Sequence, residues 1–382
     1  MAFAEPLPEM PGAQNDPETG GTLTVDLDAV ADNWQTLTRK LLTVECGAVV
    51  KANAYGLGLE PVTARLAKAG CKTFFVADIA EARRARSRAP EAAIYVLNGF
   101  SPEAAHAFAE LNAQPVINST MELAEWDAFV AGQSWRGGAA IHFDTGMNRL
   151  GMSAEEAAAL ALRLQQENHG ITLLMSHLAC AEVADHPLNA SQIRLFRELR
   201  MLYHGVPASL ANSAGIFLGD TAHFDVARPG AALYGINPTP GRPNPMRNVL
   251  ALTGRVLQVR KVPQGESVGY GAAWNAKRAS RIAVAALGYA DGLLRAGSSL
   301  DRKAGGSAIV ADKRCPIVGY ISMDLACIDV TDLPDNAVRR GDGATFIGEN
   351  LSIDEVAAAA GTIGYEVLVR LGSRCHLAYR GG

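Results

Sequence analysis

The chain lacks several features that would place it in a specialised class of protein. None of its apolar segments approaches the roughly 18 to 20 residues needed to cross a bilayer. No block of like charge is long enough for a nucleic-acid-binding arm, and the formal net charge is only −4. The six cysteines show no C-x-x-C spacing, so we expect reduced thiols packed in apolar surroundings.

The N-terminal segment also lacks the features of a targeting signal. Residues 1–21 contain four prolines, four acidic residues and no basic residue. A secretory signal opens with positive charge and continues into an apolar core. We therefore predict that residues 1–20 are a disordered tail and that the protein is soluble and cytoplasmic, with no membrane or nucleic-acid partner.

The chain does contain ample material for a core, because hydrophobic residues make up 48% and charged residues 19%. Its 382 residues exceed one typical core and predict two domains. Over residues 46–234, short β-rich runs alternate with helical segments, which predicts an α/β fold, a (β/α)₈ TIM-type barrel within residues 21–240. The predicted strands are 46–51, 73–77, 93–97, 114–117, 139–143, 171–176, 207–211 and 224–228.

Residues 241–382 have a different character and predict a mostly β C-terminal domain. Prolines between 238 and 245 mark a linker. The predicted β runs after it are 252–262, 267–270, 281–287, 307–311, 315–330 and 344–347. One obvious helix begins at Ser352 with a capping-box pattern. The run 22–27 precedes the barrel and could pair with it.

A polar residue closes every predicted barrel strand, at the end where barrel active sites lie. Asp78 and Asn118 are also suitable as helix caps. In order, the eight residues are Lys51, Asp78, Asn98, Asn118, Asp144, His177, Asn212 and Arg228.

Lys51 is the most informative of these residues. Burial lowers the pKa of an amine and allows it to form a Schiff base, although a lysine can also extend from a strand end to solvent. The loops Asn212–Gly215 and Pro229–Ala231 could present N–H groups to a phosphate, although turns and helix caps use the same residues. Together with Lys51 they favour pyridoxal 5′-phosphate as the cofactor.

A set of motifs resembles the alanine racemase family over residues 21–380. The motifs are TVDL at 24–27, AVVKANAYGLG at 48–58, FDTGMNRLGM at 143–152, MSHLA at 175–179, ANSAG at 211–215, ARPGAALYG at 227–235, VGYGAAW at 268–274, GYADGLLR at 288–295, VGYISMD at 318–324 and GTIGYEV at 361–367. The resemblance implies interconversion of L- and D-alanine for peptidoglycan synthesis, pyridoxal 5′-phosphate as cofactor, and a homodimer with shared active sites.

The resemblance also implies the catalytic and cofactor-binding residues. Lys51 would bind the cofactor and serve as one catalytic base, and Tyr270 of the C-terminal domain, donated by the neighbouring subunit, would be the second. Arg228 would face the pyridine nitrogen, with His177 between Arg228 and Tyr270. The phosphate would be bound by Tyr55, Ser213, Tyr365 and the backbone around Gly230 and Ala231, with Asn212 in the same loop.

For the substrate, the resemblance implies that Arg149 contacts the carboxylate and the phenolic oxygen of the cofactor. Met323 would help to seat the carboxylate, and Tyr289 would line the way in. No metal is expected.

Two positions depart from the family pattern. The family commonly has a lysine, often carbamylated, where this chain has His142, and an arginine where it has Tyr320. Arg149 must then be held by His142, by a bound anion or by water. Because histidine titrates near neutrality, we expect this support to respond to pH.

Simpler explanations are open for single residues. His177 could be a core histidine, Tyr270 could pack at a strand end, and Arg149 could cap a helix or pair with Asp144. Among functions, a racemase of serine or of a broader set, a cofactor-binding barrel without racemase activity, and a metal-dependent aldolase are the alternatives.

Overall fold

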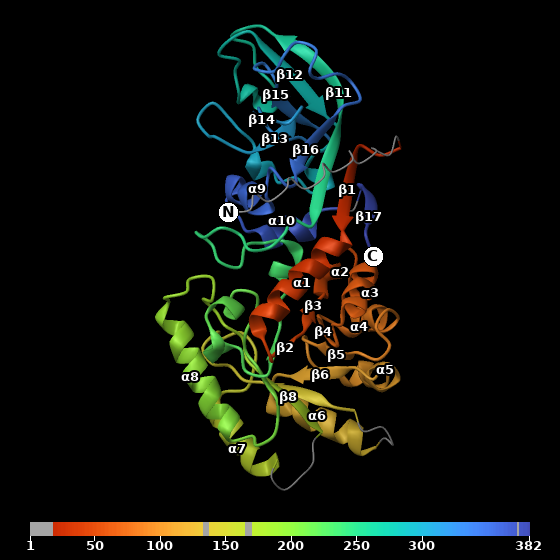
Figure 1. The fold of residues 1–382 in the computed structure, drawn as a ribbon, viewed down its shortest axis with the longest axis vertical. Coiled ribbons are helices and arrows are strands. Elements are labelled where there is room, and N and C mark those ends of the chain that lie inside the picture. Colours follow the sequence, from red (N-terminus) through yellow and green to blue (C-terminus); the bar gives the residue numbers. More distant parts are fainter. Residues whose placement is uncertain (1–17, 133–136, 165–169, 373) are drawn as a thin grey trace, which may run out of the picture. The chain divides into compact units, whose positions relative to one another are not determined.

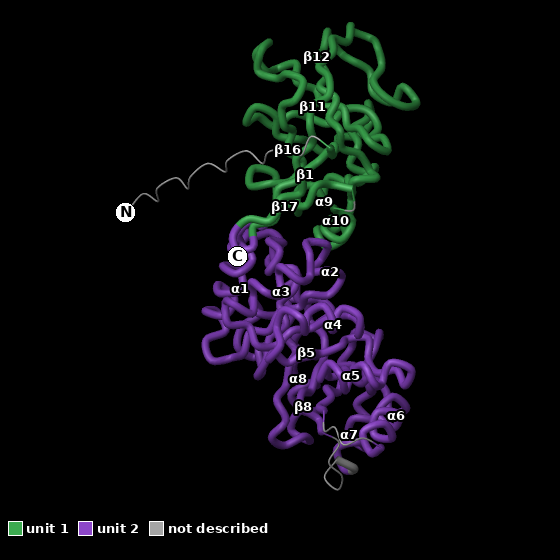
Figure 2. Tube along the Cα trace, turned by 90° about the vertical axis from the view of Figure 1, so that its right-hand side faces the viewer, with its two compact units in different colours: residues 1–26, 250–380 green, residues 27–249, 381–382 purple. Residues whose placement is uncertain are grey.

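The computed structural model describes residues 18–132, 137–164, 170–372 and 374–382, so residues 1–17 of the predicted tail lie outside the described residues. The chain divides into two compact units, which Figure 2 shows in two colours. Unit 1 contains the chain up to Asp26 together with Leu250–Arg380, and unit 2 contains Leu27–Val249 with Gly381–Gly382.

Unit 2 is built on a parallel sheet of seven strands in the order β3-β4-β5-β6-β7-β8-β9. All four residues of β4 are buried, as expected for a strand covered on both faces. The strands are β3 (Ala48–Val49), β4 (Thr73–Val76), β5 (Ala93–Val96), β6 (Gln114–Ile117), β7 (Ala139–His142), β8 (Ile171–Met175) and β9 (Ala208–Ser209).

Helices follow most of these strands, and Figure 1 shows α3, α4 and α5 along one side of β3 to β6. The α-helices of unit 2 are α1 (Leu27–Leu41), α2 (Lys51–Tyr55), α3 (Leu59–Ala69), α4 (Ile79–Arg86), α5 (Ala105–Leu111), α6 (Thr120–Ala131), α7 (Ala154–Leu164) and α8 (Pro187–Met201). Single 3₁₀ turns occur at Pro102–Ala104, Gly215–Phe217, Asp220–Ala222 and Ala231–Tyr234.

Two further short strands connect the edges of the sheet. β10 (Val226–Ala227) pairs in parallel with β2 (Glu45–Cys46). Arg228 N donates to Ala211 O at 2.8 Å, and Val49 N donates to Pro229 O at 2.9 Å. The predicted class, a barrel followed by a mostly β domain, is confirmed, with seven strands in one sheet and the eighth run joined through β10.

The predicted first strand is divided between β2 and β3 at Gly47. A Cβ on this residue would lie 2.9 Å from Phe75 Cε2 and 3.1 Å from Thr73 O. Glycine therefore allows the chain to lie close against β4 at this point.

Unit 1 is an eight-stranded sheet in which β14-β13-β16-β11-β1-β17 are neighbours and β12 joins β11 to β15. β1 pairs antiparallel with β11 and parallel with β17, so the expectation that run 22–27 pairs with the barrel was wrong. The strands are β1 (Gly21–Asp26), β11 (Leu250–Val262), β12 (Ser280–Ala285), β13 (Ser307–Val310), β14 (Lys313–Pro316), β15 (Ala326–Asp329), β16 (Gly343–Ile347) and β17 (His376–Arg380).

Other parts of unit 1 also differ from the sequence-based predictions. The run 267–270 forms only a bridge between Ser267 and Asn275, and the run 315–330 is divided between β14 and β15. The capping box at Ser352 begins α9 (Ile353–Ala360) as predicted, and a second helix, α10 (Gly364–Arg370), follows it. Single 3₁₀ turns occur at Tyr270–Ala272, Tyr289–Asp291 and Arg295–Gly297.

Helices α4, α6 and α7 of unit 2 begin with the same capping arrangement, which at α7 is the acceptance by Ser153 Oγ from Glu156 N at 3.2 Å. Asp78 Oδ1 accepts from Glu81 N at 2.9 Å, as predicted for a cap. At α6 the cap is Ser119 rather than Asn118, because Ser119 Oγ accepts from Glu122 N at 3.1 Å. None of the described helices is long and apolar enough to cross a membrane.

Candidate active site

Lys51 is the first residue of α2 and is partly buried. Burial lowers the pKa of its amine, and the positive charge of Arg149 lowers it further, while the carboxylate of Glu81 acts in the opposite direction. A lowered pKa increases the share of neutral amine, which is the nucleophilic form.

The turn that carries Lys51 is left-handed. Residues 52–55 have φ between 53° and 56° although none of them is glycine, and Gly56 continues the run at 89°. A left-handed conformation costs an L-residue roughly 1–2 kcal/mol, so a run of four needs support from its surroundings.

Arg228 is buried at the end of β10 and is held by three acceptors. Its Nη1 donates to Ser209 Oγ and its Nη2 to Ser176 O, both at 2.6 Å. Nη2 also lies 3.3 Å from His177 Nδ1. Burial lowers the pKa of the guanidinium to about 10, so it is protonated at neutral pH.

The contact with Arg228 fixes the protonation of His177. Since a guanidinium can only donate, His177 Nδ1 accepts, and the ring proton lies on Nε2. Burial and the charges of Arg228 and Arg149 lower the pKa of His177 to about 3. At neutral pH His177 is therefore a neutral imidazole with one N–H left to donate.

His142, at the end of β7, is neutral as well. Its Nδ1 lies 2.9 Å from Asn118 Oδ1, and because Asn118 Nδ2 donates to Val116 O, the amide oxygen accepts and the ring proton lies on Nδ1. Burial and the charges of Arg228 and Arg149 lower the pKa of His142 to about 4. The expectation that this support titrates near neutrality was wrong.

Asp144 organises the loop that leads to Arg149. Its carboxylate accepts from Gly146 N and Met147 N at 2.9 Å and from Asn148 N at 3.0 Å, and these bonds lower its pKa despite burial. Within the described residues, Arg149 has neither an ion pair with Asp144 nor a hydrogen bond to His142. Its exposed guanidinium is thus available to an anionic ligand.

A second group of residues forms a cradle after β9 and β10. Ser213 Oγ accepts from Gly230 N at 3.0 Å and from Ala232 N at 3.1 Å. The buried N–H of Ala231 between them has no hydrogen-bond partner within the described part of the chain. A Cβ on Gly230 would lie 2.3 Å from Tyr55 Oη, so the tyrosine hydroxyl reaches the same place.

Asn212 has a local role in the same loop, because its Oδ1 accepts from Gly215 N at 2.9 Å. Burial raises the pKa of Tyr55 to about 12, so its hydroxyl is protonated and can donate. The cradle thus offers a hydroxyl donor and a backbone donor, which suit a phosphate oxygen.

The remaining predicted site residues lie in unit 1. Tyr270 is 72% exposed on a 3₁₀ turn between Gly269 (φ 80°) and Gly271 (φ 65°). Tyr289 and Met323 are neighbours, because Tyr289 N donates to Ser322 O and Ala290 N donates to Met323 O, both at 3.0 Å.

Three tyrosines of unit 1 have the following surroundings. Tyr289 lines a cavity of about 460 Å³ together with Arg295 and Arg370. The ring of Tyr320 lies 4.0 Å from the guanidinium carbon of Arg295, a cation–π contact. Tyr365 lies in the first turn of α10 and is partly buried.

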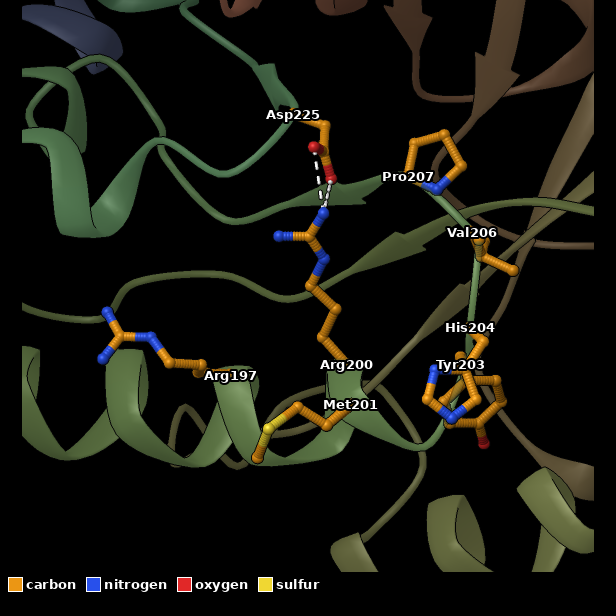
Figure 3. Close-up of a pocket in the computed structure, with 9 residues that line it drawn as sticks. Arg197, Arg200, Met201, Tyr203, His204, Val206, Pro207 and Asp225 are labelled. Atoms are coloured by element: carbon orange, nitrogen blue, oxygen red, sulfur yellow. Dashed lines mark hydrogen bonds and ion pairs between the residues drawn. The ribbon is translucent and has the colours of Figure 1, made fainter.

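A cavity of about 480 Å³ in unit 2 lies before β9 and β10, at the end opposite Lys51. Figure 3 shows Arg200 of α8 reaching across it to Asp225, at 2.7 and 3.0 Å. Asp225 also accepts from Ala208 N at 2.8 Å. This ion pair fastens α8 to the start of two strands, which is a structural role.

The sequence-based prediction missed several residues that support the site. Glu81, Arg84 and Asn53 hold the turn of Lys51, and Ser209 holds Arg228. The spacing Asp78-x-x-Glu81 is a capping pattern that could have indicated Glu81. No local pattern indicates the contact between Asn118 and His142.

The fold and the strand-end residues define an enzyme of the α/β-barrel type with a basic, anion-accepting site. Residues 25–238 match the family model "Alanine racemase, N-terminal domain", and residues 249–379 match "Alanine racemase, C-terminal domain". The chain belongs to the alanine racemase family and is an enzyme of the isomerase class.

Individual relatives agree with this assignment. The chain is 51% identical to an alanine racemase of Methylobacterium sp. (strain 4-46) over 94% of this chain and 98% of the relative. It is 44% identical to a catabolic alanine racemase of Mesorhizobium japonicum (95% and 94% covered) and 43% to a biosynthetic one of Agrobacterium fabrum (94% and 93%). A crystal structure of alanine racemase from Bartonella henselae with covalently bound pyridoxal phosphate has a TM-score of 0.89 and 37% identity, covering 95% of this chain and all of the other.

Proposed function

We propose that the chain interconverts L-alanine and D-alanine, with pyridoxal 5′-phosphate bound covalently to Lys51. The observation that carries the proposal is the partly buried Lys51 amine at the end of β3, whose pKa is lowered by burial and by Arg149. The covalent cofactor of the Bartonella henselae relative supports the same assignment.

The cradle fits the phosphate of this cofactor. The Tyr55 hydroxyl and the Ala231 N–H are the donors for it, Ser213 holds the loop in place, and a side chain at Gly230 would fill the space. Asn212 shapes the preceding turn. Arg149 carries the positive charge for the phenolic oxygen and for the substrate carboxylate.

When bound, pyridoxal 5′-phosphate supplies an electron sink that makes the α-proton of an amino acid acidic. Inverting the centre then requires a proton carrier on each face of the α-carbon. We assign Lys51 to one face and Tyr270 of the partner subunit to the other. Each direction of the reaction uses both residues.

The Arg228–His177 pair is compatible with a mechanism in which Lys51 and Tyr270 act on opposite faces of the α-carbon. Arg228 keeps its proton at neutral pH, so it would donate a hydrogen bond to the pyridine nitrogen of the cofactor without protonating it, which would favour return of a proton to the α-carbon. His177 is neutral and has Nε2–H left to donate. In the proposed dimer this N–H would donate to the phenolic oxygen of Tyr270 of the partner subunit.

The proposal includes a homodimer. Tyr270 is 72% exposed, and Tyr289 (43%), Met323 (53%) and Ile363 (61%) are exposed apolar or aromatic side chains of the same unit. Exposed side chains of this kind are typical of a surface that a partner covers when they form a contiguous patch. We further propose that the enzyme acts in the cytoplasm and supplies D-alanine for peptidoglycan.

Chiral analysis after incubation with L-alanine or L-serine tests the proposed reaction. We expect alanine to reach equal amounts of both enantiomers, and Lys51→Ala to be inactive. Faster racemisation of serine would favour the alternative of a serine or broad-range racemase. Cofactor binding without turnover of either amino acid would contradict the proposal.

A further inference from the structure

The left-handed turn that carries Lys51 is held by α4 as well as by its own backbone. Asn53 N donates to Glu81 Oε1 at 3.0 Å, and the other oxygen of Glu81 accepts from Ala77 N at 2.9 Å. One carboxylate therefore links the end of β4 to a peptide two residues beyond Lys51. Figure 1 shows α2, α3 and α4 next to one another, and α2 contacts both of the others.

A second connection reaches the same turn through Arg84. Its Nη2 donates to Asn53 Oδ1 at 2.6 Å, while its Nε and Nη2 contact the two oxygens of Glu60, each at 2.6 Å. Asn53 Oδ1 also accepts from Leu59 N at 3.1 Å. Asn53 is thus held at its backbone by α4 and at its side chain by both α3 and α4.

Electrostatics couples Glu81 to Lys51 directly. The charged groups that act on the Lys51 amine are Arg149 and Glu81, and they act in opposite directions. His177 lies within the field of Lys51, and the buried phenol of Tyr234 lies within the field of Glu81. Loss of the negative charge of Glu81 would therefore lower the pKa of Lys51 further, because the effect of Arg149 would no longer be opposed.

We propose that Glu81 is a positioning residue for Lys51: its hydrogen bond to Asn53 N fixes the left-handed turn that presents the amine to the cofactor, and Arg84 supports the same turn. The inference rests on the proposed function, since that function assigns the Lys51 amine to the cofactor. Glu81 itself is not a catalytic residue, because it acts through Lys51, by holding the turn and by its charge.

Glu122 is a matched control for this role. It stands three residues after its cap, as Glu81 does, and its carboxylate accepts from Asn118 N at 2.7 Å and from Phe100 N. It therefore fastens the loop after β5 in the way that Glu81 fastens the turn after β3. The contacts of Glu122 do not include the turn of Lys51.

Amide hydrogen exchange of the full chain without cofactor tests the structural part of the proposal. Glu81→Gln keeps the size of the side chain but places an NH₂ group opposite a backbone donor. Losing one such bond should raise exchange in the peptide 51–58 about tenfold. Glu122→Gln should leave this peptide unchanged and raise exchange at residues 98–102 instead.

The rate of covalent attachment tests the positioning part. Apoprotein is mixed with pyridoxal 5′-phosphate, reduced with borohydride at intervals, and the adduct at Lys51 is measured by mass spectrometry. We expect attachment, compared at high pH where the amine is fully neutral, to be about tenfold slower in Glu81→Gln, with its pH profile shifted to lower pH, and unchanged in Glu122→Gln. Arg84→Lys should also raise amide exchange at 51–58 and slow attachment at Lys51, each by a smaller factor. If Glu81→Gln does not fold, these two measurements on Arg84→Lys test whether the turn positions Lys51.

Three results would overturn the proposal: unchanged exchange at 51–58 in Glu81→Gln, an equal rise in Glu122→Gln, or faster exchange with an unchanged attachment rate. Failure of the proposed function has a different signature. In that case the unsubstituted protein forms no adduct at Lys51, while the exchange results still report on Glu81.

Discussion

Adding one methyl group at Gly230 should weaken cofactor binding by a predictable amount. The new Cβ would lie 2.3 Å from Tyr55 Oη and 3.0 Å from Tyr55 Cζ, where an ordinary contact is about 3.5–4.0 Å. The φ of Gly230 is −125°, outside the left-handed region, so the clash rather than φ dominates. Either the loop or the tyrosine must move by roughly 1 Å.

Tyr55 has little room to withdraw. Its ring lies 4.7 Å from that of Tyr234, whose hydroxyl is fixed by donation to Val49 O at 3.0 Å. Overpacking of this kind costs about 1–3 kcal/mol. When this free energy is lost from the cofactor-bound form, Gly230→Ala binds pyridoxal 5′-phosphate roughly 5- to 150-fold more weakly than the unsubstituted protein.

A double-mutant cycle isolates the clash from other effects. Absorbance titration of the apoproteins gives the affinities, and thermal unfolding without cofactor checks that the fold is intact. Because Tyr55→Phe removes the hydroxyl, Gly230→Ala should cost less than about 1 kcal/mol in that background. Equal costs in both backgrounds, or no loss of affinity in Gly230→Ala, would refute the assignment of the cradle.

The other predictions concern the amine, the second base and the loop of Arg149. Lys51→Ala should lack the absorbance of covalently bound cofactor, and a normal spectrum would remove Lys51 from this role. Tyr270→Phe should keep the cofactor but lose turnover in both directions, while solvent-deuterium exchange at the α-carbon survives mainly for D-alanine; equal loss for both enantiomers would contradict the two-face assignment. Since a neutral His142 cannot form a carbamate, activity should not depend on bicarbonate, whereas His142→Lys should acquire that dependence. The pKa of Asp144 is lowered in the folded state, so its contribution to stability is present above the unfolded value of about 3.9 and is lost as pH falls through the folded value; Asp144→Asn should remove this acid limb from a plot of Tm against pH.

The strand-end residues of the barrel could be predicted because their signals are local. An apolar run followed by Lys51, or by His177, marks the end of a parallel strand without knowledge of the rest of the fold. The capping residues Asp78 and Ser352 were predicted for the same reason, since a cap bonds only three residues away. The reaction itself came from the resemblance and not from these patterns.

What could not be predicted depends on contacts distant in sequence. β1 pairs with β17, more than 350 residues away, and nothing in a six-residue run specifies that partner. The neutral state of His142 results from its burial and from the positive charges of Arg228 and Arg149, which no spacing reveals. The hydrogen bond from Asn53 N to Glu81 joins α2 to α4 and likewise needs the fold.

A mixed-dimer experiment tests the central claim most directly. Lys51→Ala and Tyr270→Phe are purified separately, unfolded or dissociated together, reassembled and assayed for alanine racemisation. If Lys51 of one subunit works with Tyr270 of the partner subunit, each mixed dimer has one intact site. A random mixture should then recover about one quarter of the unsubstituted activity. Activity that stays at the sum of the two inactive variants would contradict a site shared between subunits with these two bases.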